Sequence, residues 1–255
     1  MSPHDPLAPV RLRGIASFLG RPIGDLEDLR PGDVAMVGLF HDHDDFIGFG
    51  ARFAARQIRY ASRPAYGLVD SDRTAPTADA DAAGRVFDLG DLNVFPLERP
   101  RQCAALQGQL AAMLAVGARV VVVGGAMSLH EVVAAAMDPP VAAPSLPSLR
   151  IGAPARCGAP SSGFGAVPGR RGALGAAFLE VDLGGLFDPA AGRHAASGLL
   201  VALGALSMRQ VRVAHLTGFA PELDLSARHE TALAARILQK LVQAMVRGVR
   251  DALAP

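Results

Sequence analysis

Apolar runs separated by polar turns recur along the chain, and the short runs predict strands. A strand buried on both faces of a parallel sheet reads as a near-continuous hydrophobic segment, rich in Val, Leu and Ala. Residues 33–40, 85–96, 118–125, 177–183 and 211–219 have this pattern. A weaker strand is predicted near residues 149–151.

The longer segments between these strands have apolar residues at helical spacing. They cover residues 51–62, 102–117, 128–137, 197–208 and 227–253, and the last of them predicts a long amphipathic helix. Strands that alternate with helices predict an α/β protein, with a mainly parallel sheet between two helical layers. We expect one domain over residues 1–255, interrupted by an irregular Pro/Gly-rich segment at residues 138–171.

Composition narrows the function classes. Hydrophobic residues make up 50% of the chain and charged residues 19%, which suits a compact domain with a large core. The net charge of +1 and the scattered basic residues argue against nucleic acid or an anionic membrane as a partner. No apolar run reaches the roughly 18 residues of a membrane span, and no signal core begins the chain, so we expect a cytoplasmic protein. Two distant cysteines predict reduced thiols.

Several motifs occur in an order that is typical of one family. "DVAMVGLFHD" leads into a segment with Gly50, Ala51, Arg52 and Phe53 and, further on, Ile58 and Arg59. "FDLGDLNV", "VVVVGGAMS", "LGGLFDP" and "TGFAPELD" then follow in that order. Together they resemble the ureohydrolases, which include arginases, agmatinases and related amidinohydrolases.

The resemblance implies an arginase/deacetylase-like fold, a trimeric or hexameric assembly and a dinuclear manganese site. Two Mn²⁺ ions would activate a bridging hydroxide that attacks a guanidinium carbon and releases urea. The ligands in this family are Asp and His side chains from the motifs G-G-D-H-S, D-A-H-x-D and D-x-D-x-x-D-P. Each of these motifs follows the carboxyl end of a strand.

Carried over residue by residue, the ligands are largely missing. In the loop Gly124, Gly125, Ala126, Met127, Ser128, alanine and methionine stand at the Asp and His positions. The second motif has no counterpart in "LRIGAPARCGAP". In the third motif, Asp182 matches the first aspartate and Gly184 the second, and Gly218 stands where the family has a guanidinium-binding glutamate. We therefore predict no confident catalytic residue, no bound metal and no cofactor.

The densest polar cluster offers an alternative site. "HDHDD" comprises His41, Asp42, His43, Asp44 and Asp45, at the mouth of the first predicted strand. With Asp182, and with Asp91 as a further candidate, these side chains could form a relocated metal or acid–base site. The other interpretation is a solvated loop in which Asp42 makes a structural hydrogen bond.

The remaining polar residues have structural interpretations. We expect Asp88 and Asp91 to shape a turn, Arg52 and Arg59 to anchor the first helix, and Ser128 to cap the helix that follows it. The other histidines are interpreted as isolated surface or packed residues: His130, His194, His215 and His229.

Three hypotheses follow. The first is a catalytically degenerate ureohydrolase-like protein, a non-catalytic subunit or partner in a homo- or hetero-oligomer with an arginase-like chain. The second is a metal-dependent hydrolase of guanidino or amidine compounds, with its site around His41–Asp45. The third is a small-molecule binder that uses the vestigial pocket without turnover.

Overall fold

The protein is described by a computed structural model. It describes residues 16–42, 50–62, 85–93, 98–125, 129–137, 140, 146, 148–151, 177–184, 198–201, 203, 208–221 and 229–253. Within these ranges lie the first 3-10 turns, η1 (Phe18–Gly20) and η2 (Leu26–Asp28).

A parallel sheet of six strands forms the centre of the described structure. The strand order is β2-β1-β3-β6-β5-β4, and every neighbouring pair is parallel. The strands are β1 (Val34–Gly38), β2 (Val86–Asp91), β3 (Arg119–Val123), β4 (Ser148–Ile151), β5 (Phe178–Asp182) and β6 (Val213–Thr217). Each lies within a segment that the sequence predicts as a strand or overlaps it closely. The predicted α/β class is therefore confirmed.

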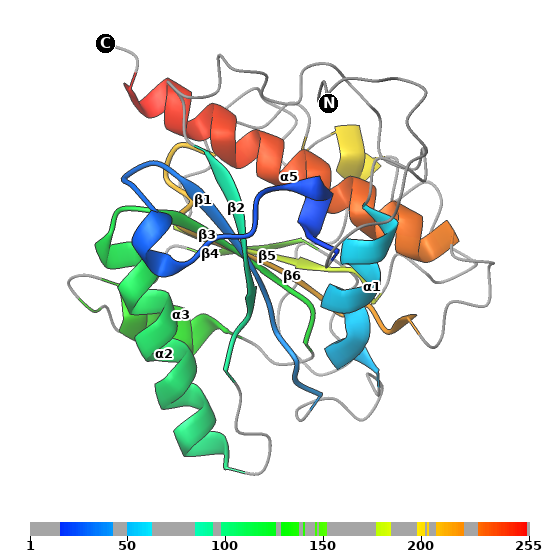
Figure 1. The fold of residues 1–255 in the computed structure, drawn as a ribbon, viewed down its shortest axis with the longest axis horizontal. Helices are drawn as coiled ribbons and strands as arrows, with labels where there is room; N and C mark the ends of the chain where they lie inside the picture. Colours follow the sequence, from blue (N-terminus) through cyan, green and yellow to red (C-terminus); the bar gives the residue numbers. More distant parts are fainter. Residues whose placement is uncertain are drawn as a thin grey trace, which may run out of the picture.

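Helices cover the sheet on both faces (Figure 1). The 3-10 turn η3 (Ala51–Phe53) and helix α1 (Ala54–Ala61) share one face with α5 (His229–Leu253). Helices α2 (Arg99–Ala115) and α3 (His130–Ala136) pack together on the other. The arrangement confirms the three-layer αβα prediction, and residues 198–201 and 203 of the predicted fourth helix are helical.

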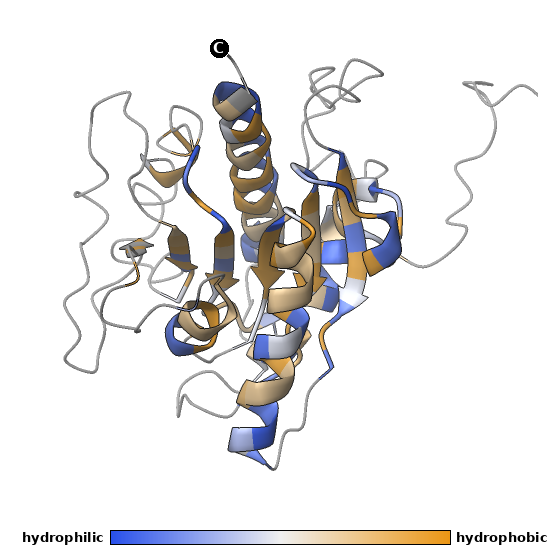
Figure 2. Ribbon diagram, turned by 90° about the vertical axis from the view of Figure 1, so that its left-hand side faces the viewer, coloured by the Kyte–Doolittle hydropathy of each residue, from blue (hydrophilic) through white to orange (hydrophobic). Residues whose placement is uncertain are grey.

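The core consists of two apolar layers, one on each side of the sheet. Alternate residues of a strand face opposite sides, so Val121 and Val123 join the layer under α1 and α5, while Val120 and Val122 join the layer under α2 and α3. Figure 2 shows hydrophobic strands between helices that carry polar residues on their outer faces. None of the helices in the described part of the chain has the length and hydrophobicity needed to cross a bilayer.

The structure also bears on the predicted start of the third helix and on the predicted irregular segment at residues 138–171. Helix α3 begins at His130, with Leu129 at the N-cap position. Ser128, which the sequence predicts as the cap, lies outside the described residues, so its capping role stays a prediction. The weak strand predicted near residues 149–151 is confirmed as β4, while most of residues 138–171 lies outside the described ranges. Cys103, in α2, has a free thiol.

The connections define one place along the sheet where a ligand site is expected. From β1 the chain passes through α1 to β2, on one side of β1, and then through α2 to β3, on the other side. In open α/β sheets, such a reversal marks the usual place for ligands, which here is the carboxyl ends of β1 and β3. The glycine pair after β3 lies at this point.

Candidate functional site

The turn after β3 is built from two glycines in the left-handed backbone region. Gly124 has φ 89° and Gly125 φ 78°, where a side chain is strained. A Cβ at Gly125 would lie 2.7 Å from Leu39 Cδ2, and one at Gly124 would lie 3.2 Å from the Ala55 nitrogen. The turn therefore lies directly against the start of α1 and the end of β1. Ala126, Met127 and Ser128, the rest of the vestigial loop, lie outside the described residues.

Two side chains of β6 bind the carbonyls of this turn. His215 Nε2 lies 3.0 Å from the Gly124 oxygen, and the Thr217 hydroxyl donates to the Gly125 oxygen at 2.7 Å. A carbonyl only accepts, so the His215 Nε2 must carry a proton. His215 is fully buried and Thr217 is 7% exposed. The sequence interpretation of His215 as an isolated packed histidine therefore missed its tie to the glycine turn.

Asp182, the one ligand candidate of the third motif, forms a hydrogen bond within the turn that follows β5. Its Oδ1 accepts a hydrogen bond from the Gly184 nitrogen at 2.9 Å. It also fills the space beside Gly218, where an added Cβ would lie 2.1 Å from the same oxygen. Gly218 has φ 77°, so both the backbone and the neighbouring carboxylate favour glycine. The position that resembles the family's guanidinium-binding glutamate thus has no room for a side chain in this conformation.

The structure describes only the first part of the alternative polar cluster. His41 follows β1 and is 4% exposed. Asp42 accepts hydrogen bonds from the Gly50 nitrogen at 3.0 Å and the Arg52 nitrogen at 2.6 Å, and it pairs with the Arg52 side chain at 3.2 Å. Asp42 therefore makes the structural hydrogen bonds expected of it. His43, Asp44 and Asp45 lie outside the described residues, so the relocated site stays a prediction.

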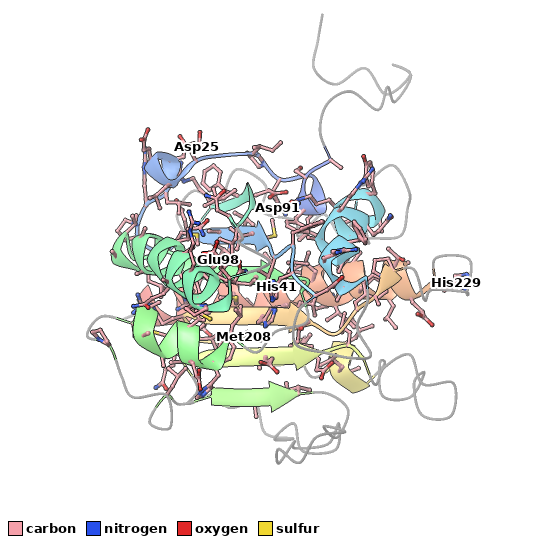
Figure 3. All side chains as sticks on the ribbon, turned by 90° about the horizontal axis from the view of Figure 1, so that it is seen from below. Asp25, His41, Asp91, Glu98, Met208 and His229 are labelled. Carbon is pink, nitrogen blue, oxygen red and sulfur yellow. The ribbon has the colours of Figure 1, made fainter. Side chains whose placement is uncertain are left out.

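His229 and the two aspartates of β2, Asp88 and Asp91, lie apart from the polar cluster. In Figure 3, His229 lies at the far end of α5, well away from His41. Asp88 and Asp91 bind the Arg59 side chain, which donates to both carboxylate oxygens of Asp88 at 2.9 and 3.0 Å. Although burial lowers the pKa of Arg59, its hydrogen bonds and charge interactions with the two aspartates leave the pKa raised above the ordinary value. As expected, these residues anchor α1 and shape the turn.

One buried acidic residue was missed by the sequence reasoning. Glu180 lies in the middle of β5, is 5% exposed, and is the register partner of His215 on β6. Registered partners on neighbouring parallel strands point to the same face, so both side chains lie in the layer under α2 and α3. A charged residue inside the apolar run "FLEVD" is the signal that would have identified it.

The donor chemistry of this edge does not suit a dinuclear manganese centre. Alanine has no donor atom and methionine offers a soft thioether, whereas Mn²⁺ prefers carboxylate, carbonyl and water oxygens. Within the described ranges, no group of three or more His, Cys, Asp or Glu side chains has an arrangement that could hold a metal ion.

Comparisons with known proteins agree with the motifs. Residues 32–141 match the sequence model of the arginase family. No curated protein gives a match.

Solved structures with the same fold cover nearly the whole chain. Proclavaminate amidino hydrolase from Streptomyces clavuligerus superposes with a TM-score of 0.67 at 19% identity, covering 92% of this chain and 98% of its own. A hypothetical agmatinase from Burkholderia thailandensis gives 0.67 at 18% identity, covering 95% and 93%. Agmatine ureohydrolase of Thermoplasma volcanium gives 0.65 at 15% identity, covering 96% and 98%. At these identities the likeness is one of fold, and it confirms the arginase-like architecture.

Proposed function

On the premise that the chain has the ureohydrolase fold and that residues 32–141 match the arginase family, we propose that it is a non-catalytic ureohydrolase-like subunit. Its role would be to assemble with an active agmatinase- or arginase-like chain and to stabilise or regulate it. The proposal also places the protein in the cytoplasm, without a metal cofactor of its own.

The observation that supports this function is that the chain has the glycine turn after β3 but not the Asp and His residues that follow it in ureohydrolases. The glycine pair after β3 has positive φ angles and packs closely against its neighbours. The two residues that follow it are alanine and methionine, where ureohydrolases have metal ligands. Two further positions agree. Glycine occupies position 218, and the Asp182 carboxylate is turned back onto the backbone of Gly184. A dinuclear site needs several hard ligands, and a single carboxylate does not hold two divalent ions.

Assembly with a second chain follows from what the resemblance implies. Ureohydrolases form trimers or hexamers, so a chain that keeps the fold can still take a place in such an oligomer. The described residues keep the core that such a fold requires, with an apolar layer on each side of the sheet. A subunit of this kind contributes contacts, and it leaves hydrolysis to the partner.

An assay of the purified chain tests the loss of catalysis. The protein is incubated with agmatine, arginine or a guanidino acid over a series of Mn²⁺ loadings, and urea release is measured. An active agmatinase serves as the positive control. We expect no urea above the blank at any loading. Urea release that rises in proportion to the bound manganese would contradict the proposal.

A thermal shift with the same guanidino compounds separates this function from a small-molecule binder. A ligand present at 100 times its dissociation constant would stabilise the fold by about 2.7 kcal/mol. A pure subunit shows no such shift, whereas a shift that saturates with concentration would favour the binder.

A further inference from the structure

Three neighbouring strands are in contact at their carboxyl ends, β6 and β3 through side chain–backbone hydrogen bonds and β6 and β5 through a backbone bond and close packing. In the sheet, β6 lies between β3 and β5. Thr217 and His215 of β6 reach the carbonyls of Gly125 and Gly124 after β3. On the other side, Asp182 at the end of β5 binds Gly184 and lies against Gly218, the residue that follows β6.

Backbone hydrogen bonds also join β6 to the segments that follow β3 and β5. The Gly124 nitrogen donates to the Leu216 oxygen at 2.8 Å, and the Leu183 nitrogen donates to the Thr217 oxygen at 2.8 Å. Both glycines after β3 thus have bonded backbone groups on the side of β6. A buried carbonyl without a donor destabilises a fold, so these bonds contribute directly to the stability of this edge.

The space around Gly218 leaves little room for a further ligand side chain. Asp182 Oδ1 accepts a hydrogen bond from the Gly184 nitrogen, and a side chain at position 218 would have to displace that carboxylate. The contacts around Gly218 therefore suit an edge held together by hydrogen bonds and close packing.

We propose that these contacts form a closed junction, made of Gly124, Gly125, Asp182, Thr217 and Gly218, which holds the carboxyl ends of β3, β6 and β5 together through the chain's own groups. The proposal implies that the stability of this edge does not depend on a divalent metal. This inference rests on the proposed function, because it explains how the chain keeps the ureohydrolase fold without ligands.

Hydrogen exchange of the full chain, followed by mass spectrometry, tests the junction locally. Thr217→Val removes the hydroxyl but keeps the side-chain shape, and Thr217→Ser keeps the hydroxyl. We expect Thr217→Val to speed exchange in residues 119–125 by about tenfold, which corresponds to the loss of one buried hydrogen bond. Thr217→Ser should remain close to wild type in the same segment.

A second hydroxyl provides the matched control elsewhere in the fold. Ser62 accepts a hydrogen bond from the Leu19 nitrogen at 2.9 Å and donates to the Arg59 oxygen at 3.2 Å. Ser62→Ala should speed exchange around residues 16–20 and leave residues 119–125 unchanged. Faster exchange of residues 119–125 in Ser62→Ala, or unchanged exchange there in Thr217→Val, would overturn the junction.

A second experiment tests the effect of metal and uses the wild-type protein alone. The wild-type protein is compared in MnCl₂ and in EDTA, with exchange of residues 119–125 and 178–184 as the readout. We expect identical exchange and the same urea midpoint in both. Slower exchange of these segments in MnCl₂ would overturn the proposal. Failure of the junction is distinguishable from failure of the proposed function, which depends on urea release and on assembly.

Discussion

Arg59→Met is expected to destabilise the protein far more than the same substitution at Arg52, because only Arg59 belongs to a buried ion pair. The Arg59 side chain is 10% exposed and that of Asp88 is 2% exposed. Arg59 also donates to the Gly90 oxygen at 2.7 Å and lies over the Phe18 ring, with 4.1 Å between the guanidinium carbon and the ring centroid.

Removing the Arg59 guanidinium leaves the Asp88 carboxylate buried with only backbone donors. The Phe18 and Gly90 nitrogens, at 2.8 and 2.9 Å, would remain as partners. Breaking a buried pair by deleting one partner costs about 3–5 kcal/mol, and we expect Arg59→Met to fall in this range. The Arg52 side chain is 46% exposed, so Arg52→Met should cost less than about 1 kcal/mol.

Urea unfolding followed by far-UV circular dichroism measures both costs. Repeating the titration in high salt sharpens the comparison, because salt screens the exposed pair and leaves the buried one largely unaffected. Adding Asp88→Asn to Arg59→Met should recover part of the loss, since the buried charge is gone and the single amide oxygen still accepts one of the two backbone hydrogen bonds. Equal costs for the two arginine variants, or an Arg59→Met protein within 1 kcal/mol of wild type, would refute the reasoning.

Further substitutions test the edges of the sheet. Gly218→Ala should lower the thermal unfolding temperature more than Gly90→Ala does. Both residues have positive φ, but a Cβ at Gly218 would meet the Asp182 carboxylate, whereas nothing lies within 4 Å of a Cβ at Gly90. Equal losses in the two variants would show that the contact with Asp182 does not contribute to stability. Arg119→Lys should cost about 1–3 kcal/mol in urea unfolding, because one ammonium cannot replace a guanidinium that binds three backbone carbonyls, two of them in buried contacts. Arg209→Lys, at an exposed position, is the control and should be neutral, so a similar loss there would contradict the prediction.

Arg119 also illustrates a feature that sequence patterns do not contain. Its guanidinium binds the carbonyls of residues 208, 209 and 245, which lie far along the chain. Burial and the nearby charge of Arg212 lower the pKa of Arg119 to about 10. Such partners are backbone atoms of distant segments, and no local pattern identifies them.

The strands were predictable because burial on both faces leaves a direct mark on the sequence. In β1 and β3 every residue is buried, and both were found as short apolar runs. The first residue of α3 was not predicted correctly. The letters "SLHE" match a capping-box pattern, but the helix begins two residues after the serine. Local propensity indicated the helix, and the packing of Leu129 in the core fixed its first residue.

The candidate site was predictable in its position and only partly in its contacts. The motifs located the glycine turn, Asp182 and Gly218, and the structure brings these to the same edge of the sheet. No sequence pattern indicates that Thr217 and His215 bind the turn, since their partners are backbone carbonyls more than 90 residues away. Glu180 was overlooked because a single charge in an apolar run changes the strand prediction little.

Native mass spectrometry of the protein isolated from its own cells, with metal analysis of the same sample, decides whether it is a non-catalytic subunit. We expect a stoichiometric complex with a second, manganese-loaded chain that hydrolyses a guanidino compound, while this chain carries no metal. A homo-oligomer in which this chain holds its own manganese and releases urea would show that it is an enzyme in its own right.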